Sequence, residues 1–307
     1  MAFLYLLERI RVPGLNECML LITQLGEETA FLVIALIVFW CADKRKGYFL
    51  MAVGFAGTII NQFLKLWFRI PRPWVLDPDF TILEQAREAA AGYSFPSGHT
   101  QMAVGTFGSL AVTTKKKSVA IACVIVAALV AFSRMYIGVH TPADVLTSVA
   151  IALVLIFTLK PMASRWESRQ MKLAIAGMLG MAVALLCFVE FYPLGEVDAH
   201  NLESGRKNAY TMLGCLVGVA VVYPAERKFV NFETKAVWWA QILKVILGLA
   251  LTLLVKEGLR TPLEWILPVY PARALRYFLI VVTAGFLWPI TFRYFSKLGA
   301  KNELRNH

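Results

Sequence analysis

The sequence predicts an all-α fold, a polytopic transmembrane helical bundle, on three observations. Of its 307 residues, 58% are hydrophobic and only 17% are charged, which is too apolar for an ordinary soluble domain. Apolar runs close to the roughly 20 residues that cross a bilayer recur from end to end. Short polar connections separate these runs, without a long linker. The chain is therefore expected to be an integral, multi-pass membrane protein.

Nine spanning helices are predicted from these runs. The first is the least regular, because Gly26, Glu27 and Glu28 interrupt it, and its membrane part is expected to begin near Thr29. The preceding residues 1–13 lack the basic leader of a cleaved signal and are expected to form an interfacial helix. The predicted spans are residues 19–42, 48–68, 97–113, 118–139, 142–160, 173–191, 208–225, 237–257 and 275–296.

The net charge of +11 at pH 7 is attributed to topology. No nucleic-acid partner is expected, because the basic residues lie between the apolar runs and not in one stripe. By the positive-inside rule, the connections rich in Lys and Arg are cytoplasmic, which places the N-terminus outside and the C-terminus inside. The basic connections are residues 44–46, 115–117, 160–172, 227–235 and 293–305, and the outer ones are residues 69–96, 139–142, 192–207 and 258–274.

Three polar clusters could carry chemistry, and on this topology all three lie at the outer face of the membrane. The first follows the second predicted helix, where Pro73 stiffens the exit of the chain. Lys65 offers a compact positive charge, and Arg72 offers a planar fork that can hold two phosphate oxygens. Basic side chains that reach the lipid interface would explain this cluster equally well.

The second cluster, Ser97, Gly98 and His99, opens the third predicted helix. Ser97 is a good N-cap, and Gly98 allows a ligand to approach the backbone closely. Amides at a helix N-terminus bind anions, so an oxyanion could rest there with His99 in reach as a proton donor or acceptor. The alternative interpretation is a simple capped helix start.

The third cluster runs from the fourth predicted helix into the fifth. Arg134 lies in an otherwise apolar helix, where a cation needs an anionic partner such as a substrate phosphate. Thr141 is the expected N-cap of the next helix and Asp144 lies in its first turn, so capping could explain Asp144 completely. In the functional interpretation, the Asp144 carboxylate accepts a hydrogen bond from His140. This bond fixes the imidazole tautomer and makes the other ring nitrogen more basic for attack.

Together these clusters resemble the three signature motifs of the type 2 phosphatidic acid phosphatase superfamily, in order and in internal spacing. The resemblance implies a metal-independent phosphatase without a cofactor, which acts on a lipid phosphate or a polyprenyl diphosphate among the surrounding membrane lipids. The three cations would take the place of a metal ion. The matching positions are Lys65, Arg72 and Pro73; Pro96, Ser97, Gly98 and His99; and Ser133, Arg134, His140 and Asp144.

The resemblance also implies a role for each matching residue. His140 would attack phosphorus and form a phosphohistidine, and His99 would protonate the leaving oxygen and later activate water. Asp144 would orient His140. The phosphoryl oxygens would be held by Lys65, Arg72, Ser97, Gly98 and Arg134.

The resemblance covers roughly residues 20–190. We therefore divide the chain into residues 1–191, a six-helix phosphatase core with the N-terminal interfacial segment, and residues 192–307, about three additional C-terminal helices of unknown role. A lateral gate, a dimer surface and a headgroup-selecting lid are equally open for the second part, as is the oligomeric state. His200 and His307 are expected to be solvated surface residues.

Two other functions fit the same residues. A transporter or scramblase could bind phosphate headgroups with Lys65, Arg72 and Arg134, and it would not need the histidine pair. A vanadate-dependent haloperoxidase holds vanadate in a similar pocket, but the spanning helices argue against this alternative.

Overall fold

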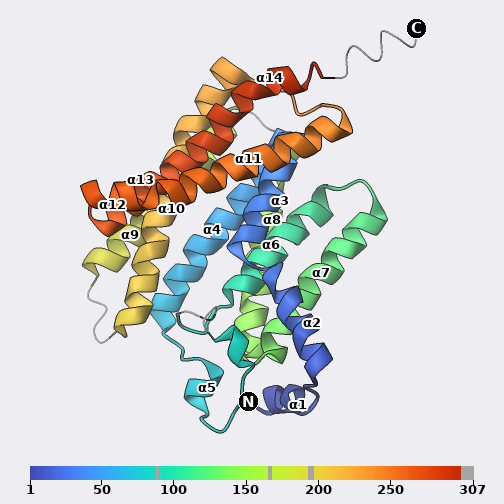
Figure 1. The fold of residues 1–307 in the computed structure, drawn as a ribbon. Coiled ribbons are helices and arrows are strands. Elements are labelled where there is room, and N and C mark those ends of the chain that lie inside the picture. Colours follow the sequence, from blue (N-terminus) through green and yellow to red (C-terminus); the bar gives the residue numbers. More distant parts are fainter. Residues whose placement is uncertain (88–89, 91, 165–167, 193–196, 299–307) are drawn as a thin grey trace. The chain divides into compact units, whose positions relative to one another are not determined.

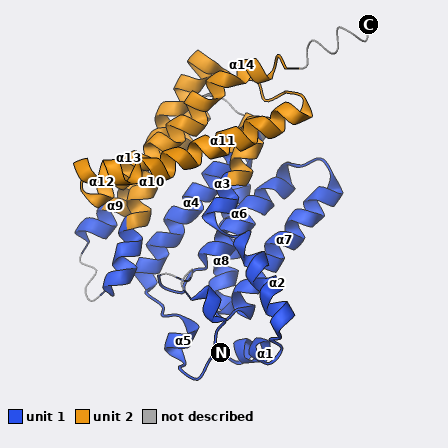
Figure 2. Ribbon diagram, viewed as in Figure 1, with its two compact units in different colours: residues 1–32, 49–165, 187–206 blue, residues 33–48, 166–186, 207–307 orange. Residues whose placement is uncertain are grey.

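The computed structural model describes residues 1–87, 90, 92–164, 168–192 and 197–298. Over these residues the secondary structure is helical and contains no strand, which confirms the predicted all-α class (Figure 1). The chain divides into two compact units, coloured separately in Figure 2. Unit 1 contains residues 1–32, 49–165 and 187–206, and unit 2 contains residues 33–48, 166–186 and 207–307. His307 and the end of the basic C-terminal stretch lie outside the described residues.

Seven helices in the described part of the chain are long and apolar enough to span a membrane. An eighth span results if the bent pair Pro13–Gln24 and Glu28–Ala42 is counted as one. Its 53° bend falls at the interruption predicted near Gly26. The chain is an integral, multi-pass membrane protein. The seven spans are Lys44–Leu76, Lys117–Tyr136, Pro142–Pro161, Arg169–Phe191, Ala199–Val230, Trp238–Ile266 and Val269–Phe295.

The remaining predicted span, residues 97–113, forms a helix that is too short to count among these. α6, Gly98–Thr113, has 16 residues. At 1.5 Å per residue it is about 24 Å long, against a hydrocarbon core of about 30 Å. It packs against both α7 (Lys117–Tyr136) and α8 (Pro142–Ser164). α6 is thus a buried helix of unit 1, and its first residue is Gly98.

Unit 1 also contains the N-terminal helices. α2 packs along α7, and the two lie side by side in Figure 1. α4 ends at Phe68, before Pro71, as the prolines predict. The remaining elements up to α6 are α1 (Ala2–Arg9), α2 (Pro13–Gln24), α3 (Glu28–Ile37) with the π-helix Val38–Ala42, α4 (Lys44–Phe68), α5 (Pro73–Leu76) and the 3-10 turn Glu84–Ala86.

Unit 2 contains most of the C-terminal helices. Within it, α10 and α13 run parallel, as two successive contacts show. The Tyr210 and Tyr270 rings stack at 5.4 Å, and one turn further along both helices Gly214 lies against the backbone of Ala274. The elements after α8 are α9 (Ser168–Phe191), α10 (Ala199–Ala225), η3 (Glu226–Val230), α11 (Trp238–Gly258), α12 (Arg260–Ile266), α13 (Val269–Val282), η4 (Thr283–Leu287), η5 (Trp288–Thr291) and α14 (Phe292–Phe295).

One predicted loop is partly wrong. Residues 199–207 were expected in the outer connection, but they form the first turns of α10. The cause is local, since the Asp198 carboxylate accepts a hydrogen bond from the Asn201 amide at 3.0 Å and caps the helix start. His200 lies in this first turn and is exposed, as predicted.

Candidate active site

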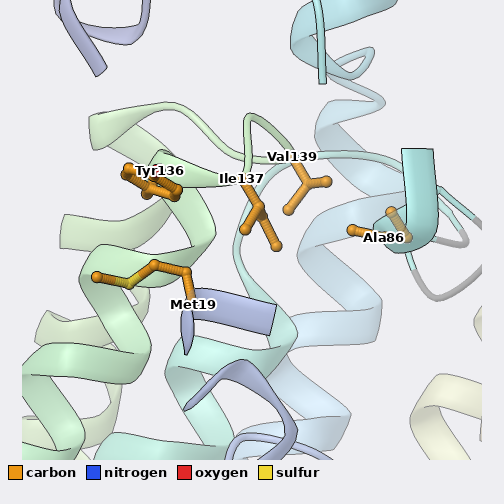
Figure 3. Packing of buried hydrophobic residues seen from close by; sticks show 6 residues of the cluster. Met19, Ala86, Tyr136, Ile137 and Val139 are labelled. Atoms are coloured by element: carbon orange, nitrogen blue, oxygen red, sulfur yellow. The ribbon is translucent and has the colours of Figure 1, made fainter. Parts of the chain in front are cut away.

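The corner between α7 and α8, residues 137–141, carries His140. Gly138 in this corner has a φ of 89°, in the left-handed region where a side chain is strained, so glycine allows the tight turn. Buried apolar side chains pack around the corner, and Figure 3 shows Met19 and Ala86 beside this stretch of chain. The members of this cluster are Met19, Ala86, Ala90, Tyr136, Ile137 and Val139.

Three carbonyl groups of this stretch accept hydrogen bonds from distant segments. A buried carbonyl without a partner is costly, so these bonds stabilise one backbone conformation. Hydrogen bonds from three separate segments therefore fix the corner that carries His140. The pairs are Arg11 Nε with the Tyr136 carbonyl at 2.9 Å, the Leu83 amide with the Ile137 carbonyl at 3.1 Å, and Arg72 Nη1 with the Val139 carbonyl at 2.9 Å.

The contacts of His140 define its tautomer. The side chain is buried, and Nη1 of Arg72 lies 2.9 Å from Nε2 of its ring. A guanidinium can only donate, so Nε2 accepts this hydrogen bond with its lone pair. Nδ1 consequently carries the proton and faces Oδ2 of Asp144 at 3.4 Å. Nε2 is therefore the basic nitrogen of His140.

The Asp144 carboxylate both faces His140 and caps the start of α8. Its Oδ2 accepts hydrogen bonds from the Thr141 amide at 2.8 Å and from the Ser94 hydroxyl at 2.6 Å. In return, the Thr141 hydroxyl accepts a bond from the Asp144 amide at 3.3 Å, so the predicted N-cap forms. The capping and the functional interpretations of Asp144 are therefore compatible. Its Oδ2 lies within reach of both the Thr141 amide and Nδ1 of His140.

Ser94 is a site residue that the sequence analysis missed. It is fully buried, and its hydroxyl lies 3.5 Å from Nδ1 of His140 as well as bonding Asp144. The only signal in the sequence is its position two residues before Pro96. The sequence does not show which residue a loop serine contacts, because that depends on how the loop folds.

The N-terminus of α6 lies against the start of α8. Ser97 caps α6 by accepting a bond from the Thr100 amide at 3.4 Å, as predicted. The Ser97 amide donates to the Asp144 carbonyl at 3.2 Å, which joins the two helix starts. His99 follows in the first turn of α6. The Nε2 atom of His99 is buried and has no hydrogen-bond partner in the described part of the chain.

Two of the cations are held by the loop that precedes α6. Lys65 donates to the Tyr93 carbonyl, and Nε of Arg72 donates to the Gly92 carbonyl at 3.0 Å. Gly92 has a φ of 78°, which favours glycine at this position. Both cationic side chains are buried. The loop therefore holds both cations in place through backbone carbonyls.

The third cation, Arg134, is held by the N-terminal part of the chain. Nη1 of Arg134 donates to the Thr23 hydroxyl of α2 at 2.7 Å. Just beyond α2, a Cβ on Gly26 would lie 2.8 Å from the carbonyl oxygen of His99, so the bend after α2 packs closely on the start of α6. The sequence analysis missed Thr23, because no pattern links residues that are 111 positions apart.

The eight predicted site residues thus lie in one neighbourhood of unit 1. Lys65, Arg72, Arg134 and His99 are all close enough to act electrostatically on His140, and Ser97 and Asp144 contact each other through the backbone. Several donors and one basic imidazole nitrogen converge there, an arrangement that can bind a tetrahedral oxyanion and attack it. Within the described residues, no group of three or more His, Cys, Asp or Glu side chains could hold a metal ion.

The electrostatic surroundings keep His140 neutral. It lies in the corner outside the spanning helices, and burial lowers the pKa of its imidazole well below the ordinary 6.5. The nearby positive charges of Arg72 and Arg134 lower this pKa further, because they oppose a second cation. Nε2 therefore stays unprotonated at neutral pH.

Comparison with known proteins adds independent findings. Residues 45–168 match the PAP2 superfamily, and residues 210–301 match the family described as PAP2 superfamily phosphatase, transmembrane extension. Phosphatidylglycerophosphatase B of Bacillus subtilis is 32% identical over 164 residues, which are 49% of this chain and 76% of the relative.

Two further relatives carry the name undecaprenyl-diphosphatase. BcrC of Bacillus subtilis is 32% identical over 145 residues, 47% of this chain and 72% of the relative. The Sulfolobus acidocaldarius protein is 28% identical over 138 residues, 44% of this chain and 65% of the relative. Among solved structures, the transmembrane PAP2 type phosphatidylglycerolphosphate phosphatase from Bacillus subtilis is 29% identical, with a TM-score of 0.46 over 54% of this chain and 85% of that one.

The first prediction concerns the protonation of His140. We expect its imidazole to titrate well below pH 6.5, because burial and the neighbouring cations disfavour the charged form. NMR of isotope-labelled histidine across a pH series measures this, with the resonance assigned by comparison with His140→Gln. A midpoint at or above 6.5 would contradict the electrostatic account.

The second prediction concerns the support of Arg134 by the N-terminal helix. Thr23→Val keeps the shape and removes the acceptor, so orthovanadate binding measured by calorimetry should weaken by about 1 kcal/mol, roughly fivefold. Thr106→Val is the matched control, because Thr106 is also buried and its hydroxyl donates to the Met102 carbonyl of its own helix at 2.7 Å. Equal affinity in the two variants would show that Thr23 does not position Arg134.

Proposed function

Because the chain belongs to the PAP2 superfamily and is a phosphoric ester or diphosphate hydrolase, we propose that it attacks a membrane lipid phosphate or a polyprenyl diphosphate through a phosphohistidine intermediate. The names of the relatives, a phosphatidylglycerophosphatase and two undecaprenyl-diphosphatases, support this substrate class. The single observation that carries the mechanism is the His140 contact set, with a proton on Nδ1 facing Asp144 and a lone pair on Nε2.

The proposed reaction has two displacements. Nε2 of His140 attacks phosphorus, the bond from phosphorus to the leaving oxygen breaks, and His99 gives that oxygen a proton. His99 then takes a proton from water, whose oxygen attacks the phosphohistidine and breaks the P–N bond. The products are inorganic phosphate and the dephosphorylated lipid, or the monophosphate when the substrate is a diphosphate.

The fixed donors bind the phosphoryl group and stabilise the transition state. Charge in phosphoryl transfer spreads over the equatorial oxygens, so prepositioned cations and amides lower the barrier without rearranging. In the structure, Arg72 donates to Nε2 of His140. A bound phosphoryl group takes over this guanidinium and frees the lone pair for attack. The proposed ligands of the phosphoryl oxygens are Lys65, Arg72, Ser97, Gly98 and Arg134.

The sidedness of the protein is part of the proposal. The positive-inside rule favours an extracytoplasmic active site, an outer N-terminus and a cytoplasmic C-terminus. We also keep residues 1–191 as the proposed phosphatase core and residues 192–307 as an additional C-terminal part. Lipid would reach such a site from the outer leaflet.

The third prediction tests catalysis. The purified protein should release phosphate from at least one of phosphatidic acid, phosphatidylglycerol phosphate and undecaprenyl diphosphate. His140→Ala removes the nucleophile and should reduce kcat/KM at least about a thousandfold. Arg134→Ala removes one buried cation and should reduce it about a hundredfold. Equal activity of both variants and the parent would exclude the mechanism.

A trapping experiment separates the two displacements. An aryl phosphate has a leaving group that needs no proton, so His99→Ala should still form the phosphohistidine but hydrolyse it slowly. Radiolabelled phosphate should then remain on the protein in an acid-labile, base-stable bond. His140→Ala should retain none. Lipid translocation that persists when both histidines are replaced by alanine would favour the transporter or scramblase instead.

The fourth prediction tests sidedness. In a variant without the five native cysteines, a cysteine is placed at one of two exposed positions by Asp79→Cys or Lys116→Cys. A membrane-impermeant maleimide should label the first in intact cells and the second only after permeabilisation, because the basic connection is expected inside. The opposite pattern would invert the proposed topology.

A further inference from the structure

Two buried amide side chains near the site have no role in the mechanism described so far. Asn61 on α4 is 1% exposed and Gln101 on α6 is 3% exposed. Both side-chain polar atoms of each residue have no hydrogen-bond partner among the residues described. A buried amide without partners is destabilising, so a native structure that keeps two of them needs an explanation.

The position of Asn61 points to the phosphoryl site. It lies four residues before Lys65 on α4, so the two side chains share one face of the helix. Its Oδ1 is 3.9 Å from the place that a Cβ on Gly98 would occupy. Gly98 is the first residue of α6. The Asn61 amide therefore lies beside the helix N-terminus at which an oxyanion is expected to rest.

The Gln101 side chain, which comes from α6, packs against α4 at Gly57, one helical turn before Asn61. Any side chain at Gly57 would collide with the Gln101 amide, and Gly57 lies four residues before Asn61. Glycine at this position therefore makes room for a second amide between α4 and α6. A half-turn of the terminal Asn61 amide exchanges Oδ1 and Nδ2, so that its donor faces the helix N-terminus.

Two further polar atoms of the same site are buried without a partner in the described part of the protein, Nε of Arg134 and Nε2 of His99. The first is a donor, and the second donates when it carries the proton that the proposed mechanism assigns to His99. One ligand rich in acceptor oxygens would satisfy these donors and Nδ2 of Asn61 together. A neutral amide suits this place, because a fourth cation would add to the repulsion among Lys65, Arg72 and Arg134 before substrate binds.

We propose that Asn61 is a further substrate-binding residue, whose Nδ2 donates a hydrogen bond to an oxygen of the phosphoryl group. This inference rests on the proposed function, since it assigns a ligand to the same phosphoryl group. Asn61, on α4, thus adds a neutral donor to the three charged donors of the site.

The test compares Asn61→Leu with the parent, because leucine has nearly the same volume and no polar atom. Three quantities are measured: kcat/KM for phosphate release from phosphatidic acid in detergent micelles, the orthovanadate Kd by calorimetry, and the thermal unfolding midpoint. We expect kcat/KM to fall at least about tenfold and the vanadate Kd to rise about tenfold. The unfolding midpoint should stay the same or rise, because an unpaired buried amide is replaced by an apolar group.

Ser109→Ala is the matched control. Ser109 is also a fully buried residue of α6 whose hydroxyl has no partner among the described residues. It lies roughly 16 Å from Gly98 along the helix, so its removal should leave kcat/KM and the vanadate Kd unchanged.

Two results would overturn the inference. The first is a parental vanadate Kd in Asn61→Leu. The second is a raised Kd together with a lowered unfolding midpoint, which would make Asn61 a structural residue. If the parent releases phosphate from no lipid, the proposed function fails, but the vanadate comparison still decides the role of Asn61.

Discussion

The burial of three cations around one imidazole is the constraint on which the rest of unit 1 depends. Lys65, Arg72 and Arg134 are each at most 7% exposed, and desolvation of a charge is expensive unless other groups take the place of water. Here backbone carbonyls and a threonine hydroxyl accept hydrogen bonds from the three cations. The phosphoryl group proposed as the ligand of this site offers several acceptor oxygens to such donors.

Asp144 connects the loop that holds two of those cations with the starts of α6 and α8. Its Oδ2 accepts from the Ser94 loop and caps α8, and its backbone carbonyl accepts from Ser97 at the start of α6. Orientation of His140 is therefore a consequence of how two helices begin. A change at Asp144 would disturb the helix start and the imidazole together, so activity alone cannot separate its two contributions.

The N-terminal helices belong to the same arrangement, although they lie before the matched family region of residues 45–168. Thr23 holds Arg134, Gly26 packs on His99, and Arg11 holds the corner that carries His140. The apolar cluster of Figure 3 explains how they are kept in place, because Met19 of α2 packs with the corner residues. On the other side, α4 brings Asn61 and Lys65 to the start of α6. The site is thus bounded by helices from three separate stretches of chain.

The sequence by itself determined the all-α membrane class, most helix positions, and the motif residues, since apolar run length, prolines and caps act over a few residues. The N-caps Ser97 and Thr141 and the break near Gly26 were predicted for this reason. Only the tertiary structure decided that Thr23 meets Arg134, that Ser94 meets Asp144, and that α6 is a buried helix shorter than the bilayer. These pairings join residues 111 and 50 positions apart. Side-chain contacts at such separations depend on how whole helices pack, and no local pattern in one sequence encodes that.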